Sequence, residues 1–392
     1  MSAPASAEAP ADPLAQVAKF APEIRRRADE FERNRRIADD LAQRMAEAGL
    51  FRLLVPACYG GGEVHPRLYF DTLTATAQAD GAVGWVQMIA VTTGIMAASL
   101  PHEWSEILYG NNPRSITTGV TAPLGKAYPD SGGLRVSGRW PFGSGSQVAD
   151  WICGGCLLMD DAGPRTDEHG VPQSLLVFFP AADVLIHEDT WETSGLCGTG
   201  SHDIEVTDLF VPAGRWAQLG KRPRVEAPLY RFPTFGMLAL GVSAVALGIA
   251  LHAIEAFVAL ATEKIPTGSR RSLAQRSGVQ KDLARAEAAV QSARALTHEA
   301  IDEAWQCANA EGRLSTHIKA RLRLAASNNA WSAAAAVDLV YHAAGGTAIY
   351  TKNPLQRCFR DVHVTTQHLM VAQPTFEVVG KVLLGQDPKT PL

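Results

Sequence analysis

The spacing of apolar residues changes twice along the 392-residue chain, and these changes constrain the fold more than any single motif. Residues 14 to about 112 place apolar side chains three and four apart, as in "LAQRMAEAGLFRLLVP", which predicts helices. From about 113 to 215, short β-branched and aromatic runs are divided by Gly, Pro and Asp, which predicts strands. After a proline-containing linker at 220–233, long helical segments return.

This order predicts an α+β protein without βαβ alternation, so a Rossmann domain is not expected. We expect an N-terminal helical domain at 14–112, a central antiparallel β-barrel or sandwich at 113–219, and a C-terminal four-helix bundle at 220–392. Residues 1–13 are rich in Ala and Pro and are predicted to form a disordered tail.

Composition excludes several classes of function. The net charge of −4 leaves no basic surplus for binding nucleic acid. The charge-free stretch 235–251 is too short to span a membrane, so we expect a buried bundle helix whose Gly241 and Gly248 admit a close neighbour. Six cysteines are too few for a disulfide scaffold, and no secretory signal is recognised, which together favour a cytoplasmic protein.

Two short motifs contain potential metal ligands, but neither has the arrangement that a metal site requires. In "RDVHVTTQHLM" (360–370), a continuous helix would separate His363 and His368 by about 140°, so they are not expected to share a metal. The CxxC of Cys153 and Cys156 lies in an apolar run and lacks further ligands, so both thiols are expected to be buried in a strand. "GTGSHD" (198–203) is interpreted as a loop between strands.

The segment "GRWPFGSGSQVADW" (138–151) combines aromatic side chains and small hydroxyls with glycines that permit close approach of a planar ligand. Such a surface suits a flavin ring, whose edge requires hydrogen bonds and whose face requires apolar contacts. A tight turn between strands explains the same residues equally well.

Nearly the whole chain resembles the acyl-CoA dehydrogenase superfamily. The resemblance is carried by "LAQRMAEAGLFRLLVPACYGGGE", "GAVGWV", "VSGRWPFGSGSQVADW", "LCGTGSHDIEVTDLFVP" and "YHAAGGTAIYTKNPLQRCFRDVHVTTQH". More narrowly, the chain is similar to the two-component flavin-dependent monooxygenases, such as the oxygenase components of p-hydroxyphenylacetate hydroxylase and dibenzothiophene monooxygenase. The resemblance implies a reduced flavin (FADH2 or FMNH2), O2 as co-substrate, a separate NAD(P)H-dependent flavin reductase and a homotetramer.

The resemblance also implies roles for individual residues. Ser144 would hydrogen-bond flavin N5, and His368 would control a proton near the reacting oxygen. Asp361 would orient His368 or, as we expect, form an ion pair with an arginine. The remaining implied flavin contacts are Trp140, Phe142, Thr118, Arg270, Gly345 and Gly346, the last three across a subunit interface, and the implied substrate contacts are Trp85, Thr92, Thr93 and His368.

At two positions the chain differs from the pattern of related enzymes, and these differences narrow the range of reactions that we expect. Leu369 stands where many dehydrogenases of this superfamily keep a glutamate base, and Thr92-Thr93 stand where several phenol hydroxylases carry a histidine. We therefore expect a monooxygenase that hydroxylates an electron-rich aromatic or heteroaromatic small molecule, indole- or phenol-like, through a C4a-hydroperoxyflavin. The alternatives are an N- or S-oxygenase of the same fold, an FAD-dependent acyl-CoA dehydrogenase and a non-catalytic flavin-binding protein.

Overall fold

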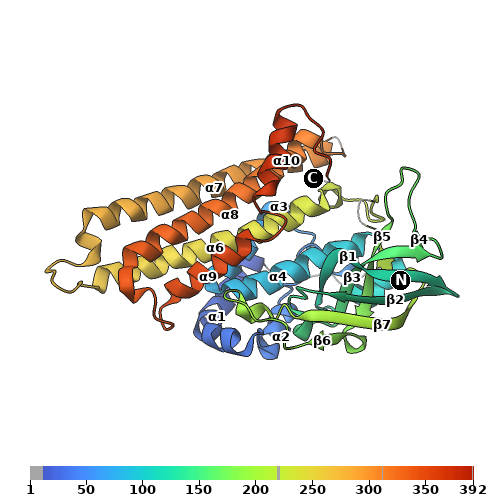
Figure 1. The fold of residues 1–392 in the computed structure, drawn as a ribbon, viewed down its shortest axis with the longest axis horizontal. Coiled ribbons are helices and arrows are strands. Elements are labelled where there is room, and N and C mark those ends of the chain that lie inside the picture. The colour runs from blue at the N-terminus through green and yellow to red at the C-terminus, as the bar shows by residue number, and fades with distance from the viewer. Residues whose placement is uncertain (1–11, 219–220, 311, 391) are drawn as a thin grey trace, which may run out of the picture.

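The structure is a computed structural model that describes residues 12–218, 221–310, 312–390 and 392. The tail expected at 1–13 lies outside the described residues except for its last two positions, and so does the expected domain boundary at 219/220. The chain forms helices, then a sheet, then helices again (Figure 1). The long helices of the C-terminal part run side by side along the longest axis, and the sheet lies at one end of the molecule.

The first part of the chain is helical up to residue 110. Its helices are α1 (Pro13–Asn34), α2 (Asp39–Glu47), α3 (Pro66–Ala79), α4 (Gly81–Gly94) and α5 (His102–Ser105). Local sequence fixes where they begin. Pro13 opens α1, whose first turn is capped by the Asp12 side chain, and the buried Asp80 carboxylate accepts from Ala82 N and Val83 N at the start of α4.

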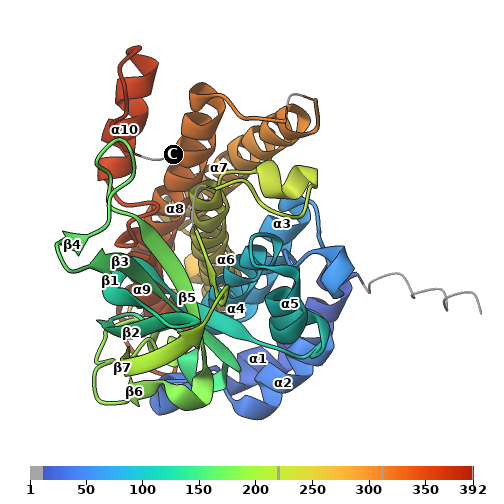
Figure 2. The same cartoon turned by 90° about the vertical axis from the view of Figure 1, so that its right-hand side faces the viewer.

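Within the described residues, eight strands form one sheet in the order β6-β7-β2-β1-β3-β5-β8, with β4 paired to β3. The strands are β1 (Thr117–Asp130), β2 (Gly133–Trp140), β3 (Trp151–Asp160), β4 (Gly163–Pro164), β5 (Ser174–Pro180), β6 (Leu185–His187), β7 (Asp203–Pro212) and β8 (Trp216–Ala217). In the view of Figure 2 the strands lie in front, with the helices of the bundle behind them.

The expected antiparallel arrangement is wrong for one pair, because β1 and β3 run parallel. β2 returns along β1 as a hairpin, so the chain leaves Trp140 at the end of the sheet where β1 began. The loop 141–150 stays at that end, and Trp151 then starts β3 directly beside Thr117. The sheet is therefore mixed, and this loop lies next to the first residues of β1.

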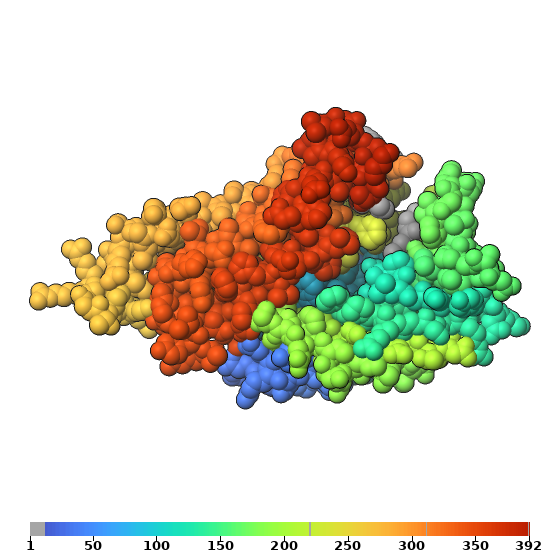
Figure 3. All heavy atoms as spheres, in the orientation of Figure 1, coloured from blue at the N-terminus to red at the C-terminus, as the bar shows by residue number. Residues whose placement is uncertain are grey.

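The C-terminal part contains α6 (Thr234–Glu263), α7 (Ser277–Ala310), α8 (Thr316–Ala344), α9 (Pro354–Thr366) and α10 (Pro374–Leu383). The first four build the expected bundle, and α10 is a further short helix that packs on α8. In the space-filling view, the segment that follows α8 lies on the surface between the bundle and the sheet (Figure 3).

The close approach predicted for α6 is confirmed. A Cβ on Gly241 would lie 2.2 Å from Tyr69 Oη, and a Cβ on Gly248 would lie 2.4 Å from Thr74 O, so both glycines let α3 pack directly against α6. By length and hydropathy, Gly81–Ala98 and Thr234–Glu263 could each cross a membrane, but 89% and 83% of their most apolar windows are buried inside the protein. Burial of this extent is typical of core helices.

Candidate functional site

A cavity of about 470 Å³ lies where the N-terminal helices, the sheet and the C-terminal helices meet. Its walls come from α4, the start of β1, the loop 141–150, the loop 191–201, the start of α6 and the residues that follow α9. Most of the lining is apolar, including Ile89, Ile95, Met96, Leu176, Met237 and Leu238. This size and character are those of a binding site for a small organic molecule.

Four buried side chains on one wall form a continuous hydrogen-bonded relay. Trp85 Nε1 lies 3.1 Å from Ser144 Oγ, and Ser144 Oγ lies 2.7 Å from Ser201 Oγ. Ser201 Oγ lies 2.6 Å from Thr199 Oγ1, which lies 2.8 Å from Leu196 O. Trp85 and Ser144 were both predicted as site residues, and the structure brings them into direct contact.

The two ends of this relay fix the direction of every hydrogen bond in it. An indole N–H only donates and a carbonyl only accepts. Thr199 therefore donates its proton to Leu196 O, Ser201 donates to Thr199, and Ser144 donates to Ser201 while accepting from Trp85. Since the Ser144 proton is already committed, Ser144 presents a lone pair to the cavity, where it can accept a hydrogen bond from a bound ligand.

His368 also lines the cavity, beside Trp85, and is neutral near pH 7. α9 ends at Thr366, so His368 lies in the turn beyond the helix, and the helical geometry assumed for "RDVHVTTQHLM" is wrong at this residue. Its ring meets that of Trp85 edge to face at 5.5 Å. Burial, helped by the charge of Arg323, lowers the pKa of His368 to about 4.

The tautomer of His368 follows from its backbone contact. Nδ1 accepts from Met370 N at 3.2 Å, so Nδ1 carries no proton and Nε2 does. His368 thus brings a neutral N–H donor to the cavity. It is not the readily titrating group that its reference pKa suggests.

Thr92 and Thr93 also line the cavity, as expected for substrate contacts. Both hydroxyls donate back to carbonyls of their own helix: Thr92 Oγ1 to Met88 O at 2.8 Å, and Thr93 Oγ1 to Ile89 O at 2.8 Å. With their protons engaged in this way, the two threonines offer only lone pairs to the cavity. They can accept an N–H or O–H from a substrate but cannot deprotonate it.

Two large apolar side chains at the cavity are exposed to solvent. Phe142 is 66% exposed and Leu369 is 73% exposed, although both line the cavity. Phe142 adopts a left-handed backbone conformation (φ 66°) and packs edge to face on Trp191. They form an apolar opening to solvent, and Leu369 is the residue that replaces the dehydrogenase glutamate.

Trp140 does not line the cavity, contrary to the predicted contact with the flavin ring. Its side chain is fully buried within the sheet, where Nε1 donates to Gly155 O at 2.7 Å. Side chains at Gly125, Gly138 or Gly154 would each collide with the indole. Trp140 therefore fills the interior of the sheet, in space created by these three glycines.

Thr118 is also buried beside the cavity lining, which includes its neighbour Gly119. Its methyl group would lie 3.3 Å from a Cβ on Gly145, so it packs under the loop that carries Ser144. Among the described residues its hydroxyl has no hydrogen-bond partner. It supports the Ser144 loop from β1.

Arg270, Gly345 and Gly346 are not among the residues around the cavity. Arg270 lies in the loop between α6 and α7, before the helix start where it was expected, and the two glycines follow α8. All three are exposed, and the α6–α7 loop and the end of α8 lie together at the end of the bundle away from the sheet (Figure 1). Lys264 Nζ, which donates to Ala344 O at 2.7 Å, joins these two segments.

Three residues of the relay were not predicted from the sequence: Leu196, Thr199 and Ser201. They lie in and beside "GTGSHD" (198–203), which was interpreted as a loop between strands. The available signal was a pair of hydroxyl residues that alternate with glycines. The expected ion pair of Asp361 with an arginine is also wrong, because its Oδ1 accepts from Leu196 N at 2.6 Å.

Nothing in the described part of the chain gathers three or more potential metal ligands. Cys153 and Cys156 are buried on β3, as expected, and all six cysteines are free thiols. The polar groups of the cavity are hydrogen-bonding groups of aromatic, hydroxyl, amide and imidazole side chains. Such a set suits an organic cofactor and substrate.

Two family descriptions match the sequence. "Acyl-CoA dehydrogenase, N-terminal domain" matches residues 13–103, and "Acyl-CoA dehydrogenase, C-terminal domain" matches residues 240–373. The two matched ranges correspond to the helical parts on either side of the sheet.

Full-length relatives are monooxygenases and hydroxylases. The chain is 34% identical over 366 residues to the indole-3-acetate monooxygenase of Pseudomonas putida, covering 93% of this chain and 91% of that protein. It is 32% identical to a pigment production hydroxylase of Rhodococcus erythropolis, covering 97% and 98%. In structure it is similar to the 3-HSA hydroxylase of Rhodococcus sp. RHA1, with a TM-score of 0.88, 26% identity and coverage of 97% and 99%. The Streptomyces protein XiaF, solved with FADH2 and glycerol, has a TM-score of 0.88, 25% identity and 97% coverage of both chains.

Proposed function

Because the chain belongs to the acyl-CoA dehydrogenase superfamily and, within it, to the flavin-dependent monooxygenases, we propose that it is the oxygenase component of a two-component system. Such a component receives reduced flavin from a separate reductase and uses O2 to hydroxylate a small aromatic or heteroaromatic molecule.

The observation that carries the proposal is the absence of a carboxylate from the cavity wall. No Asp or Glu stands among the described residues that line it. An acyl-CoA dehydrogenase needs a base to remove a proton from its substrate, and neither Leu369 nor a neutral His368 whose Nδ1 is already occupied supplies one. The cavity therefore favours oxygen transfer over dehydrogenation.

The residues of the cavity fit a reduced flavin. Reduced flavin carries a proton on N5, and Ser144 presents a lone pair because the relay takes its own proton. Phe142 and Trp191 supply aromatic contacts at the opening. A bound reduced flavin would supply the chemistry of O2 activation and oxygen transfer. The protein binds and orients the reactants and keeps water away.

His368 would hold a proton at Nε2 and donate it as a hydrogen bond toward the reacting oxygen. Its depressed pKa keeps the imidazole neutral, so it donates without releasing a proton to the cavity. A site that limits free protons favours oxygen transfer over loss of peroxide. We therefore assign His368 a hydrogen-bonding role in place of a general-acid role with an ordinary pKa.

The substrate is proposed to be a planar, electron-rich ring that carries an N–H or O–H group. Thr92 and Thr93 offer acceptors for such a group, while Ile89, Met96 and Met237 offer apolar contact to the ring. Two relatives named as indole-3-acetate monooxygenases are 34% and 31% identical to this chain, and another relative is named as a resorcinol hydroxylase. Since none of the described residues that line the cavity can deprotonate a phenol, an indole-like ring is favoured. A thioether, the substrate of an S-oxygenase, would leave both threonine acceptors unpaired.

The proposal also includes a partner protein, a flavin reductase, and a homotetrameric assembly. Oxygenase components of this kind act with a separate flavin reductase, which we propose to be NAD(P)H-dependent. Arg270, Gly345 and Gly346 are exposed at the end of the bundle away from the sheet, near the exposed Ile349 and Tyr350. We propose that this end meets another subunit of a homotetramer and contributes to that subunit's flavin site. The six free thiols support a reducing, cytoplasmic location.

Stopped-flow mixing tests the function. Protein loaded with reduced flavin is mixed with O2 under single-turnover conditions, with and without indole-3-acetate or resorcinol. We expect a lag before the absorbance of oxidised flavin returns. We also expect a hydroxylated product when the added compound is a substrate. Return without a lag, together with reduction of protein-bound oxidised flavin by an acyl-CoA, would establish the dehydrogenase alternative. Failure to bind either redox form of flavin would favour a non-catalytic protein.

A further inference from the structure

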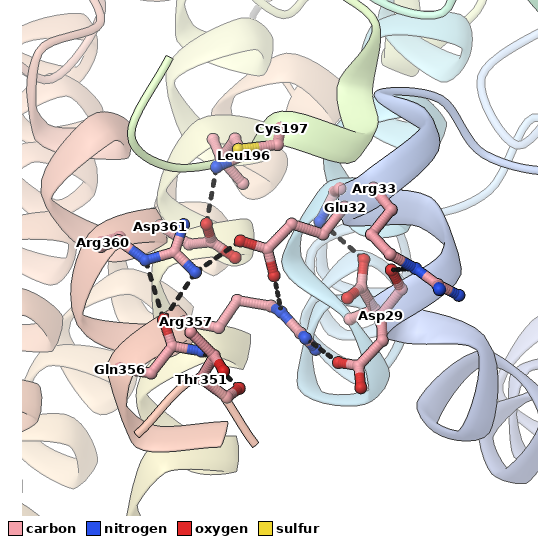
Figure 4. A network of polar contacts seen from close by, with 12 residues as sticks. Asp29, Glu32, Arg33, Leu196, Cys197, Thr351, Gln356, Arg357, Arg360 and Asp361 are labelled. Carbon is pink, nitrogen blue, oxygen red and sulfur yellow. Dashed lines mark hydrogen bonds and ion pairs between the residues drawn. The ribbon is translucent and has the colours of Figure 1, made fainter. Parts of the chain in front are cut away.

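A buried carboxylate on α9 controls the backbone at one end of the hydroxyl relay. Asp361 is 4% exposed, and its Oδ1 accepts from Leu196 N at 2.6 Å (Figure 4). Leu196 has a left-handed backbone conformation (φ 50°, ψ 34°), which is unfavourable for a leucine and persists only when neighbouring contacts hold it. The hydrogen bond from Asp361 is such a contact.

The neighbouring residues of the loop are held by the same helix. Arg360 Nη1 donates to Ser194 O, and a Cβ on Gly195 would lie 2.5 Å from Arg360 O, so the loop lies directly on the α9 backbone. Two consecutive residues of α9, Arg360 and Asp361, therefore set the path of the chain through residues 194–196.

This backbone contact determines where the relay ends. Leu196 O is the acceptor for Thr199, and the orientations of the Ser201 and Ser144 hydroxyls follow from that one bond. If Leu196 turned its carbonyl away, Thr199 could donate to Ser201, and Ser144 could then point its proton into the cavity. The lone pair offered to a ligand would be lost.

The donor end of the relay is supported by a second buried carboxylate next to the first. Asp80 caps α4, which carries Trp85. A Cβ on Gly81 would lie 3.4 Å from Asp361 Oδ2, and Asp80 and Asp361 line the same narrow internal space with Glu32 and Arg357. Glu32 in turn pairs with Arg357 and Arg360 (Figure 4). Both ends of the relay are thus anchored at one place behind the cavity.

We propose that Asp361 is a positioning residue for the oxygenase reaction, a proposal that rests on the function proposed above. By holding Leu196 in its left-handed conformation, it keeps the Leu196 carbonyl as the terminal acceptor of the relay. Ser144 then presents an acceptor to the reduced flavin, and the hydroxylated product forms in preference to peroxide. Asp361 has no contact with the cavity itself, since Leu196 stands between them.

Three variants and a control separate this role from a general loss of folding. Asp361→Ala removes the acceptor, whereas Asp361→Asn keeps a side-chain oxygen that can accept from Leu196 N. Thr199→Val leaves Asp361 intact and breaks the relay at its next step. The control is Asp338→Asn on α8, whose carboxylate pairs with His363 on the same helix as Asp361.

The first readout is hydrogen exchange at the Leu196 amide in the protein without flavin. We expect Asp361→Ala to exchange about tenfold faster at this amide, as for the loss of one ordinary hydrogen bond. Asp361→Asn, Thr199→Val and Asp338→Asn should retain the protection. Unchanged protection in Asp361→Ala, or equal loss in Asp361→Asn, contradicts the proposal.

The second readout is the ratio of hydroxylated product to peroxide for each reduced flavin consumed. Asp361→Ala and Thr199→Val should both shift this ratio toward peroxide, and Asp361→Asn should restore it, with little change in substrate KM. A normal ratio in Thr199→Val would show that the relay does not control coupling, even if Asp361→Ala fails to fold. If the wild-type protein itself makes no hydroxylated product, the proposed function fails, while the exchange data still decide whether Asp361 positions Leu196.

Discussion

Replacing Asp361 by asparagine should stabilise the folded protein progressively more as the pH rises from about 4 to 8. Burial raises the pKa of the Asp361 carboxyl to about 7, and the nearby Asp80 carboxylate acts in the same direction. Arg360 and Arg357 oppose the rise in pKa, as does the hydrogen bond from Leu196 N. Glu32 also faces this region but is paired with both arginines.

The sign and the magnitude follow from this raised pKa. Below the reference pKa of 3.8, Asp361 is protonated in both the folded and the unfolded protein. Between that pH and about 7, the unfolded chain releases the proton and the folded protein keeps it, so the free energy of unfolding falls as the pH rises. Each pH unit corresponds to about 1.4 kcal/mol, which gives a penalty of at most about 4 kcal/mol above pH 7. Asparagine cannot ionise and avoids this penalty.

The effect is measured by urea unfolding at several pH values between 4 and 8. The quantity compared is the urea concentration at the unfolding midpoint of Asp361→Asn minus that of the wild-type protein. The difference should grow in favour of the variant through this range and level off above pH 7. Asp338→Asn, which changes a half-exposed carboxylate on α8, should show no comparable trend. A difference for Asp361→Asn that stays constant or shrinks with rising pH would refute the assignment of a raised pKa to this buried carboxyl.

Three substitutions in the cavity test the roles of individual side chains. His368→Ala should lower the yield of product per reduced flavin and raise peroxide, and an unchanged yield would remove His368 from the reaction. Ser144→Ala should weaken binding of reduced flavin by about tenfold, the usual effect of one lost hydrogen bond, with a smaller effect on oxidised flavin. An equal loss for both redox forms would show that the polarised relay does not select the reduced form. Thr93→Val should raise KM by about tenfold for a substrate with an N–H or O–H group while leaving KM for its methylated analogue unchanged.

The order of helices and strands along the chain could be predicted from local patterns, because each element is determined mainly by residues close together in the sequence. The change from helical to strand spacing near residue 113 corresponds to the interval between the turn ending at Gly110 and β1. The glycine spacing of α6 predicted a close helix neighbour, although not that this neighbour is α3. The parallel pairing of β1 and β3 depends on where the loop 141–150 rests, which no local pattern specifies.

The alternation of residues along β2 is enough to place Trp140 on the buried face of that strand. Leu134, Val136 and Trp140 are all buried on β2, and the two-residue period of a strand places them on one face. The conformation at His368 could not be predicted in this way, because the position at which α9 ends depends on the turn that follows Thr366.

The relay could not have been predicted, since it joins three segments that are distant in the chain. Trp85, Ser144, Ser201 and Leu196 belong to α4 and two separate loops, and the anchor Asp361 comes from α9. The raised pKa of Asp361 likewise depends on burial and on Asp80, which lies at the start of α4. Only the folded chain places these groups together.

Isotope labelling of the product tests the central claim most directly. The protein is supplied with a flavin reductase, NADH, flavin, indole-3-acetate and ¹⁸O2, and the product is analysed by mass spectrometry. The account predicts a hydroxylated product that carries one oxygen atom derived from O2 and that forms only when reduced flavin reaches this protein. An oxygen atom derived from water, or a panel of indoles, phenols and thioethers in which every member remains unchanged while reduced flavin is consumed to peroxide, would contradict it.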